Sequence, residues 1–285
     1  MNMPPFAGST ALIIGGGQNI GRAVALEFAR RGADVAVADL DQSGAEETAA
    51  LVAELGRKSC GLRCDVTSEQ SISDTAAAAE AALGELDIVM NNAGILSGGN
   101  PEDIPLAAWQ QMMDVNYFGM VRSIEHFLPK MLARGSGHIV NTASFAGMYP
   151  FAASRIHYAA SKAAVLSMSE NLALYCLPRG VRVSCLCPGP VMTTSVQGMK
   201  HFSENYTMRA PGSHLTVKSQ AETATILADG MRDGRIIIPT HEEVWETLRQ
   251  RGPDYDAFLH GKLAEFAAGD SGKPQVPEEF LRGAK

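Results

Sequence analysis

The chain has 285 residues, of which 46% are apolar, and its formal net charge is −7. No basic face is available to neutralise phosphates, so the composition argues against nucleic acid or an anionic membrane as a partner. The five cysteines are an odd number in a chain long enough to fold without disulfides, which indicates free thiols in a reducing compartment. Residues 1–8 lack a secretory pattern and no apolar run reaches about 18 residues, so we expect a cytoplasmic protein.

Short β-rich runs alternate with stretches of helical spacing along the chain. The predicted strands are Thr10–Ile14, Asp34–Ala38, Lys58–Cys64, Leu86–Met90, His138–Thr142, Val181–Cys187 and Arg235–Ile238. The predicted helices are Ile20–Arg31, Ala45–Leu55, Glu69–Leu83, Leu106–Arg134 and Ile156–Leu177, and Pro129 should bend or end the fourth of them. Repeated strand–helix units predict an α/β, doubly wound Rossmann fold with about seven parallel strands and helices on both faces.

No linker-like stretch interrupts this alternation, so we expect residues 1–285 to form a single dinucleotide-binding and catalytic domain. Within it we expect a substrate loop at about 190–218. A C-terminal helical tail at about 241–285 should begin with the polar helix Glu242–Arg251.

A glycine-rich turn follows the first predicted strand directly and leads into a helix. It reads Gly15-Gly16-Gly17-Gln18-Asn19-Ile20-Gly21. Glycines let the backbone turn tightly and approach a pyrophosphate, whose charge then meets free N–H groups and the positive end of the helix dipole. Such turns also occur for packing reasons, so the motif predicts nucleotide binding only together with the residues that follow.

The second predicted strand leads to Asp39, where a carboxylate can accept hydrogen bonds from the ribose hydroxyls of an adenosine. A carboxylate there also repels a 2′-phosphate, and the neighbouring Leu40 and Gln18 supply no cation to offset this repulsion. The sequence therefore favours NAD over NADP. The alternative is that Asp39 only begins a turn together with Asp41.

Tyr158 and Lys162 lie near the start of the predicted helix Ile156–Leu177, at an i, i+4 spacing that places both side chains on one helix face. An ammonium group and a positive nicotinamide ring near the phenol would lower its pKa and make it a general acid and base. By itself such a pair is more often a solvated helix face. Ser144, which follows the strand His138–Thr142, supplies the context, because ligands bind at this edge of such a sheet.

Taken in order, these motifs resemble those of the short-chain dehydrogenase/reductase family, from the first strand to at least Thr193. The turn at 15–21 is similar to the family's TGxxxGxG, Asp65-Val66 to its adenine-contacting Asp, Asn91-Asn92-Ala93-Gly94 to its NNAG stretch, and Pro188-Gly189-Pro190-Val191-Met192-Thr193 to its PGxxxT segment. Asn116, Ser144, Tyr158 and Lys162 resemble its catalytic tetrad.

The resemblance implies a homodimeric or homotetrameric enzyme that uses NAD to interconvert a small-molecule secondary alcohol and a ketone. In the implied mechanism Tyr158 transfers the proton and Ser144 orients the substrate oxygen. Lys162 binds the nicotinamide ribose and lowers the tyrosine pKa, and Asn116 anchors a water of the proton relay. The implied cofactor-binding set is Gly15, Gly17, Gln18, Asn19, Ile20, Gly21, Asp39, Leu40, Asp65, Val66, Asn92, Ala93, Gly94, Tyr158, Lys162, Pro188, Gly189, Val191 and Thr193.

The sequence departs from the family pattern at several places. Ile14 stands where the family usually has Thr, and Asn19 stands at the second motif glycine, so cofactor affinity depends on these exchanges. Asn is among the few residues that tolerate a left-handed backbone. The loop Phe145–His157 is one residue longer than the common one, and the usual glycine-rich ending of the last strand is missing, so the family's tetramer contacts cannot be carried over.

Two patterns invite a metal site and are set aside. Cys185 and Cys187 lie inside the apolar run of a predicted strand, where small buried residues are the simpler explanation. His241 and Glu242 begin a metalloprotease-like pattern, but Trp245 stands where the second His is required. We therefore expect no metal.

Apolar side chains dominate the segments expected to wall the substrate pocket. They are Ile95, Leu96, Met148-Tyr149-Pro150-Phe151, the loop from Met192 to Met199, Phe202, Tyr206 and Met208. Such a lining favours a bulky hydrophobic substrate, for instance an aryl, terpenoid or steroid alcohol or ketone. Ordinary core and loop packing explains the same residues equally well.

Three other functions compete with this interpretation. An NADPH-dependent 3-ketoacyl reductase of the same family is disfavoured by Asp39. A non-catalytic dinucleotide sensor has no need of the complete tetrad. A methyltransferase also uses a glycine-rich loop, but it gives no reason for Tyr158 and Lys162 at their spacing.

Overall fold

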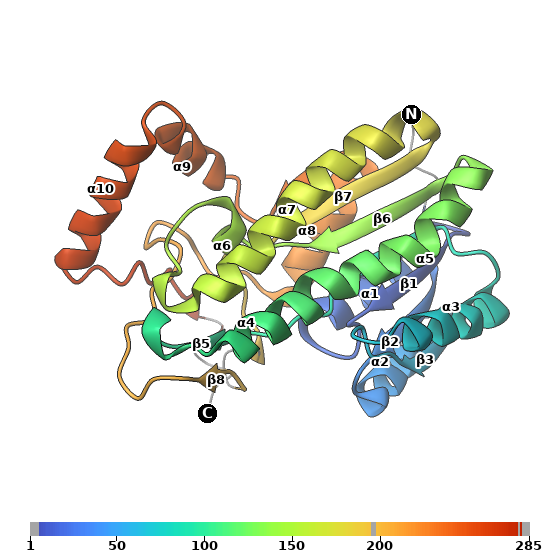
Figure 1. Cartoon of the computed structure of the whole chain (residues 1–285). Helices are drawn as coiled ribbons and strands as arrows, with labels where there is room; N and C mark the ends of the chain where they lie inside the picture. Colours follow the sequence, from blue (N-terminus) through green and yellow to red (C-terminus); the bar gives the residue numbers. More distant parts are fainter. Residues whose placement is uncertain (1–5, 195–197, 279, 281–285) are drawn as a thin grey trace.

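The computed structural model describes residues 6–194, 198–278 and 280 (Figure 1). Its centre is a seven-stranded sheet in which neighbouring strands are all parallel, in the order β3-β2-β1-β4-β6-β7-β9. The strands are β1 (Thr10–Ile14), β2 (Asp34–Asp39), β3 (Ser59–Arg63), β4 (Ile88–Asn91), β6 (Gly137–Thr142), β7 (Val181–Cys187) and β9 (Ile237–Pro239). The predicted doubly wound α/β fold is confirmed, with shifts of one or two residues at the ends of several strands.

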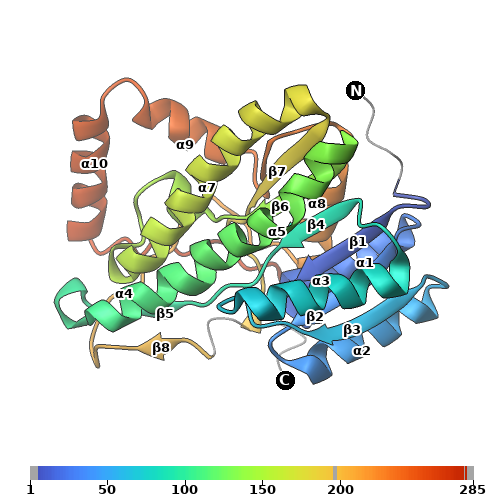
Figure 2. The same cartoon turned by 45° about the vertical axis from the view of Figure 1, so that its right-hand side comes forward.

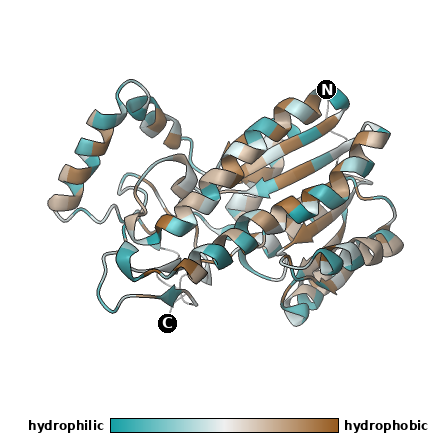
Figure 3. Cartoon of the chain, in the orientation of Figure 1, coloured by the Kyte–Doolittle hydropathy of each residue, from teal (hydrophilic) through white to brown (hydrophobic). Residues whose placement is uncertain are grey.

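Helices cover both faces of this sheet (Figures 1 and 2). On one face pack α1 (Asn19–Arg30), α2 (Gln42–Glu54) and α8 (Gln220–Arg232), whose buried residues share one apolar cluster. On the other face pack α3 (Glu69–Leu83), α5 (Gly119–Arg134) and α7 (Ile156–Cys176), which share a second cluster. A sheet buried on both faces favours strands that are mostly apolar, and Ala11, Leu12 and Ile13 of β1 are fully buried. Figure 3 accordingly shows brown, hydrophobic colouring along the central strands.

Strand order reverses between β1 and β4, and the carboxyl ends of all seven strands lie on the same edge of the sheet. The connection of β1 runs outward to β2 and β3, whereas β4 leads the other way to β6 and β7. At such a switch point the connecting loops separate and leave a crevice, which is where a ligand binds in open α/β sheets.

The predicted helix Leu106–Arg134 is helical over its whole length, but it is not α-helical throughout. It consists of α4 (Leu106–Met113), a π-helical turn η2 (Asp114–Phe118) and α5. A π-helical turn contains more residues than an α-helical turn, so it changes the direction in which the side chains after it point. Pro129 lies inside α5 and does not end it, because the helix continues to Arg134.

Shorter elements surround the carboxyl edge. They are a small parallel sheet of β5 (Ser97–Gly98) and β8 (Lys200–His201), helix α6 (Phe145–Met148), and the 3-10 turns η1 (Pro101–Asp103), η3 (Ala153–Arg155) and η4 (Leu177–Arg179). The predicted polar helix Glu242–Arg251 is α9 (Val244–Arg251), and a further helix, α10 (Tyr255–Ala267), stands away from the sheet (Figures 1 and 2). No helix in the described part of the chain is long and apolar enough to cross a membrane.

Candidate active site

The glycine-rich turn between β1 and α1 packs directly against the end of β4. Gly15 has a φ of +83°, and a Cβ atom there would overlap the backbone of Ala93. A Cβ at Gly21 would overlap the carbonyl oxygen of Gly15. The side chain of Asn92 completes this packing, since its Nδ2 donates to the Gly15 carbonyl at 2.8 Å. These contacts require glycine. The N–H groups of Gly15 and Gly16 donate to the Ala38 carbonyl, so the N–H groups left for a ligand belong to the start of α1, where the N-cap Gln18 makes no side-chain cap bond.

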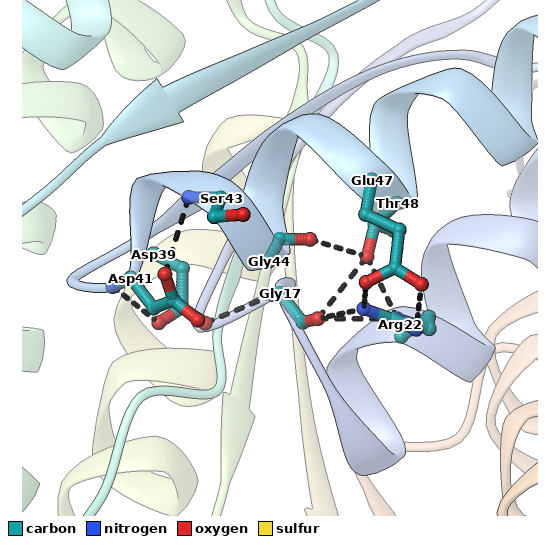
Figure 4. Close-up of polar contacts among 8 residues, drawn as sticks. All are labelled: Gly17, Arg22, Asp39, Asp41, Ser43, Gly44, Glu47 and Thr48. Atoms are coloured by element: carbon teal, nitrogen blue, oxygen red, sulfur yellow. Dashed lines mark hydrogen bonds and ion pairs between the residues drawn. The ribbon is translucent and has the colours of Figure 1, made fainter.

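Asp39 lies at the end of β2, beside the same turn. Its Oδ2 accepts a hydrogen bond from the N–H of Gly17 at 2.9 Å, and its Oδ1 accepts one from the N–H of Asp41 at 3.1 Å. The cation nearest in sequence to this turn, Arg22, is turned to the other side of Gly17 (Figure 4). There Arg22 donates to the Gly17 carbonyl and pairs with Glu47 at 2.8 Å. The carboxylate of Asp39 is thus positioned by the turn and is not neutralised by Arg22.

A cavity of about 830 Å³ opens at the carboxyl edge of the sheet. Its lining joins the glycine-rich turn and Asp39 to Ser144, Tyr158 and Lys162. Of the predicted cofactor-binding residues, it includes Gly15, Gln18, Asn19, Ile20, Asp39, Leu40, Asp65, Val66, Asn92, Ala93, Gly94, Tyr158, Lys162, Pro188, Gly189, Val191 and Thr193. One continuous cavity therefore holds nearly the whole predicted site.

Three predicted residues do not line the cavity. Gly17 donates its N–H to Asp39, and Gly21 packs against the carbonyl of Gly15, so both support residues that line the cavity. Asn116 is completely buried. The cavity also contains residues outside the predicted catalytic and cofactor-binding set. Thr194 and Gly198 belong to the predicted loop from Met192 to Met199, whereas Cys64, Thr67, Gln111, Val115, Thr142 and Ala143 are not predicted from the sequence. Their neighbours in sequence could have suggested Cys64, Thr142 and Ala143. Gln111 and Val115 come from α4 and η2, and no local motif marks them.

Tyr158 lies in the first turn of α7, and Lys162 follows one turn later. The Lys162 Nζ is 5.8 Å from the centre of the Tyr158 ring and donates to the carbonyl oxygen of Thr142 at 2.8 Å. Burial lowers the pKa of Lys162 to about 8, so the ammonium form still predominates at neutral pH.

The pKa of Tyr158 differs from the expectation. Burial of the phenol raises it above its ordinary value, while a hydrogen bond with Ser144 and the charge of Arg155 both act to lower it. In the protein by itself burial is the largest effect, and the ammonium of Lys162, which donates to the Thr142 carbonyl, is not among the groups that shift this pKa. The expected lowering by Lys162 is therefore not found, and any lowering by a positive nicotinamide ring would come on top of these contributions.

Asn116 lies in the π-helical turn η2 and connects three elements. Its Oδ1 accepts from the N–H of Ile95 at 2.7 Å, and its Nδ2 donates to the Ile95 carbonyl and to the Ser161 Oγ, each at 3.1 Å. Gly94 fits between it and Lys162, since a Cβ there would lie 3.2 Å from the Asn116 Oδ1. Asn116 thus fixes the segment after β4 against α7, directly behind Lys162.

The predicted substrate wall is only partly assembled. Ile95 and Leu96 line the cavity, whereas Met148, Tyr149 and Phe151 are buried in a separate apolar cluster with Phe145. Phe202, Tyr206 and Met208 line a second hollow of about 560 Å³, outside the main cavity. In the predicted loop from Met192 to Met199, residues 195–197 lie outside the described part of the chain, Met192 is exposed and Met199 is buried.

The sequence matches the family model described as short chain dehydrogenase over residues 9–204. The 1-deoxy-11-beta-hydroxypentalenate dehydrogenase of Streptomyces exfoliatus is 37% identical over 274 residues, which are 95% of this chain and 93% of that protein. The 7alpha-hydroxysteroid dehydrogenase of Escherichia coli K12 is 33% identical over 194 residues, which are 67% of this chain and 74% of that protein.

Solved structures agree with these matches in fold. A short chain dehydrogenase/reductase from Burkholderia phymatum, determined in complex with NAD, has a TM-score of 0.78 at 29% identity and covers 90% of this chain and 96% of its own. An NAD⁺-bound xylitol dehydrogenase has a TM-score of 0.69 at 26% identity, over 82% of this chain and 98% of its own.

Proposed function

Because the chain belongs to the short-chain dehydrogenase/reductase family, we propose that it transfers a hydride between NAD(H) and a bulky, apolar secondary alcohol or ketone. The family assignment makes it an oxidoreductase that acts on CH–OH groups with a nicotinamide dinucleotide. The choice of NAD, the residue roles and the substrate class are the proposal. The observation that carries it is the single cavity whose lining includes both Asp39 and Tyr158.

The residues present fit a dinucleotide. The turn at Gly15 leaves no room for a side chain and exposes backbone N–H groups at the start of α1, where a pyrophosphate is stabilised. Asp39 would accept hydrogen bonds from the adenosine ribose, and Asp65 and Val66 would contact the adenine. Val191 and Thr193 would hold the carboxamide at the other end of the cavity, where the bound dinucleotide supplies the hydride acceptor.

The side chains at that end supply the proton chemistry. In oxidation the Tyr158 phenolate accepts the hydroxyl proton as the substrate's C–H electron pair leaves as hydride, and in reduction the phenol returns that proton. In the protein by itself the hydrogen bond of Ser144 lowers the Tyr158 pKa, and with substrate bound the same hydroxyl would donate to the substrate oxygen instead. Lys162 would hold the nicotinamide ribose, and Asn116 keeps the wall behind it in place.

The preference for NAD rests on charge. The Asp39 carboxylate would lie close to a 2′-phosphate, and Arg22 is engaged by Glu47 and the Gly17 carbonyl (Figure 4). The substrate class rests on Ile95 and Leu96 in the cavity and on the names of the relatives, which act on a hydroxysteroid and a hydroxypentalenate. The rival NADPH-dependent 3-ketoacyl reductase would need the opposite cofactor preference.

The deciding experiment follows the absorbance of reduced nicotinamide while NAD or NADP is offered with a panel of apolar and polar secondary alcohols. We expect turnover with NAD, the highest kcat/KM with apolar alcohols, and loss of turnover in Tyr158→Phe. Higher kcat/KM for polar alcohols would overturn the substrate class. Dinucleotide binding without turnover of any alcohol or ketone would favour the sensor instead.

A further inference from the structure

Asn19 occupies a backbone conformation that glycine adopts at less cost. Its φ is +49°, and it is the one non-glycine residue with a positive φ in the described part of the chain. An asparagine tolerates this conformation better than most residues, but glycine adopts it with less strain. The backbone conformation therefore does not explain the asparagine, and the contacts of its side chain offer the other explanation.

The carboxamide of Asn19 forms a reciprocal pair of hydrogen bonds with Thr194. Its Nδ2 donates to the Thr194 Oγ1 at 3.0 Å, and its Oδ1 accepts from the Thr194 N–H at 3.0 Å. Gln220, the first residue of α8, donates from its Nε2 to the same Oδ1 at 3.3 Å and to the carbonyl of Met192 at 3.0 Å. Asn19 thus joins the glycine-rich turn to a segment that lies far along the chain.

This segment borders the cavity at the nicotinamide end of the proposed site. Val191, Thr193 and Thr194 all line the cavity, as does Asn19. The N–H of Met192 donates to the carbonyl of Lys218 at 2.9 Å, which holds the segment on its outer side. Thr193, the proposed carboxamide ligand, therefore lies between an anchor at Met192 and the contact of Thr194 with Asn19.

We propose that Asn19 is a positioning residue that holds Met192–Thr194 against the glycine-rich turn, so that Thr193 is already in place when NAD binds. This inference rests on the proposed function. A dinucleotide spans from the turn to Thr193, and a segment that is already ordered does not have to be ordered on binding. The hydrogen bonds of Asn19 consequently raise the affinity for NAD, although Asn19 acts through Thr194 and Thr193.

The test uses Asn19→Gly, because glycine accepts the positive φ and removes only the carboxamide. Loss of the hydrogen bonds to Thr194 and Gln220 should weaken NAD binding by about 5- to 15-fold. The dissociation constant is measured by isothermal titration calorimetry, which needs no turnover. The melting temperature should stay at the wild-type value or rise, and the KM for NAD should increase more than kcat falls.

Thr194→Val separates the two bonds of the pair. It removes the hydroxyl but keeps the backbone N–H that donates to Asn19, so its NAD affinity should lie between wild type and Asn19→Gly. In the double variant the valine should add nothing, because Asn19→Gly has already removed both bonds. Thr225→Val, an exposed threonine of α8, is the matched control and should bind NAD like wild type.

Asn19→Gly with wild-type NAD affinity, or additive effects of the two substitutions, would overturn the positioning role. A melting temperature that fell in step with affinity would also overturn it, since that pattern indicates general loosening. A wild-type protein that binds NAD but turns over no alcohol or ketone would overturn the proposed function. The NAD dissociation constants of the variants would still test the role of Asn19. A wild-type protein that bound no NAD would overturn both.

Discussion

Arg155 lies three residues before Tyr158 and ends the 3-10 turn η3. Its guanidinium lowers the pKa of Tyr158, against the larger opposite effect of burial. Its Nη2 donates to the carbonyl of Arg209 at 2.6 Å, which connects the start of α7 to the segment beyond β8. At the scale of a residue, then, the charge that favours the Tyr158 phenolate comes from a side chain outside the family motif.

Replacing Arg155 by Met should raise the pKa of Tyr158 further. In the proposed mechanism oxidation requires the phenolate, so the rise of kcat/KM with pH should move to higher pH. Arg155→Lys keeps the positive charge and should leave the rise near its wild-type position. The measurement is a pH profile of kcat/KM for NAD-dependent alcohol oxidation, and equal shifts in both variants would show that the charge is not the cause.

Asp39→Asn tests the proposed cofactor preference by removing the negative charge of the side chain while keeping its size. The amide keeps an acceptor for the Gly17 N–H and removes the repulsion of a 2′-phosphate. We expect the ratio of kcat/KM for NADP over NAD to rise by about 10-fold or more. Asp41→Asn is the control, since Asp41 caps α2 through the Ser43 N–H and an asparagine can do the same. An unchanged ratio in Asp39→Asn would contradict the proposed role.

At the scale of an element, the close approach of α1 to Gly15 shapes the end of the cavity that is proposed to bind the dinucleotide. Gly21 lies in the first turn of α1, directly against the carbonyl of Gly15. The overlapping atom belongs to the backbone, so it cannot rotate away from an added methyl group. The helix or the turn has to move as a unit.

Gly21→Ala should therefore lower the free energy of unfolding by about 1–3 kcal/mol and weaken NAD binding together with it. Gly261→Ala is the matched control in α10, where an added Cβ meets nothing within 4 Å. That substitution should stabilise the helix by up to about 1 kcal/mol and leave NAD binding unchanged. Chemical denaturation and calorimetry measure both quantities. A Gly21→Ala protein as stable as wild type would contradict the close packing.

At the scale of the whole molecule, burial lowers the pKa of four histidines: His126, His138, His157 and His241. The effect is largest at His138, whose pKa falls to about 3 and whose Nε2 pairs with the Ser184 Oγ at 2.9 Å inside the sheet. At neutral pH these rings are neutral in the folded protein, and burial favours that form. In the unfolded chain they regain a pKa near 6.5 and take up protons below it.

Unfolding therefore binds protons as the pH falls below about 6.5, so the stability contributed by neutral histidines is lost on acidification. His138 alone should remove about 1.4 kcal/mol of unfolding free energy per pH unit between about pH 6 and its folded pKa. Urea denaturation at a series of pH values measures this slope. His138→Gln should reduce the slope by one proton. A pH-independent stability from 7.5 to about 5 would contradict the assignment.

The order of strands and helices followed from the sequence, because a parallel sheet buried on both faces needs continuous apolar runs, and these are visible without coordinates. The glycine-rich turn, Asp39, Ser144, Tyr158 and Lys162 could be found in the same way, since each follows directly on a predicted strand or begins a predicted helix. These features are local, and short-range spacing determines them.

Other features depend on contacts between distant segments, and only the tertiary structure decided them. The π-helical turn at Asn116 and the bonds of its side chain to Ile95 and Ser161 are features that no helical periodicity reveals. The same is true of the Tyr158 pKa, which burial raises, and of Met148 and Phe151, which pack into the core instead of lining the cavity. The pairing of Asn19 with Thr194 joins residues that are far apart in the sequence. They meet because folding brings the loop after β1 and the loop after β7 to the same edge of the sheet.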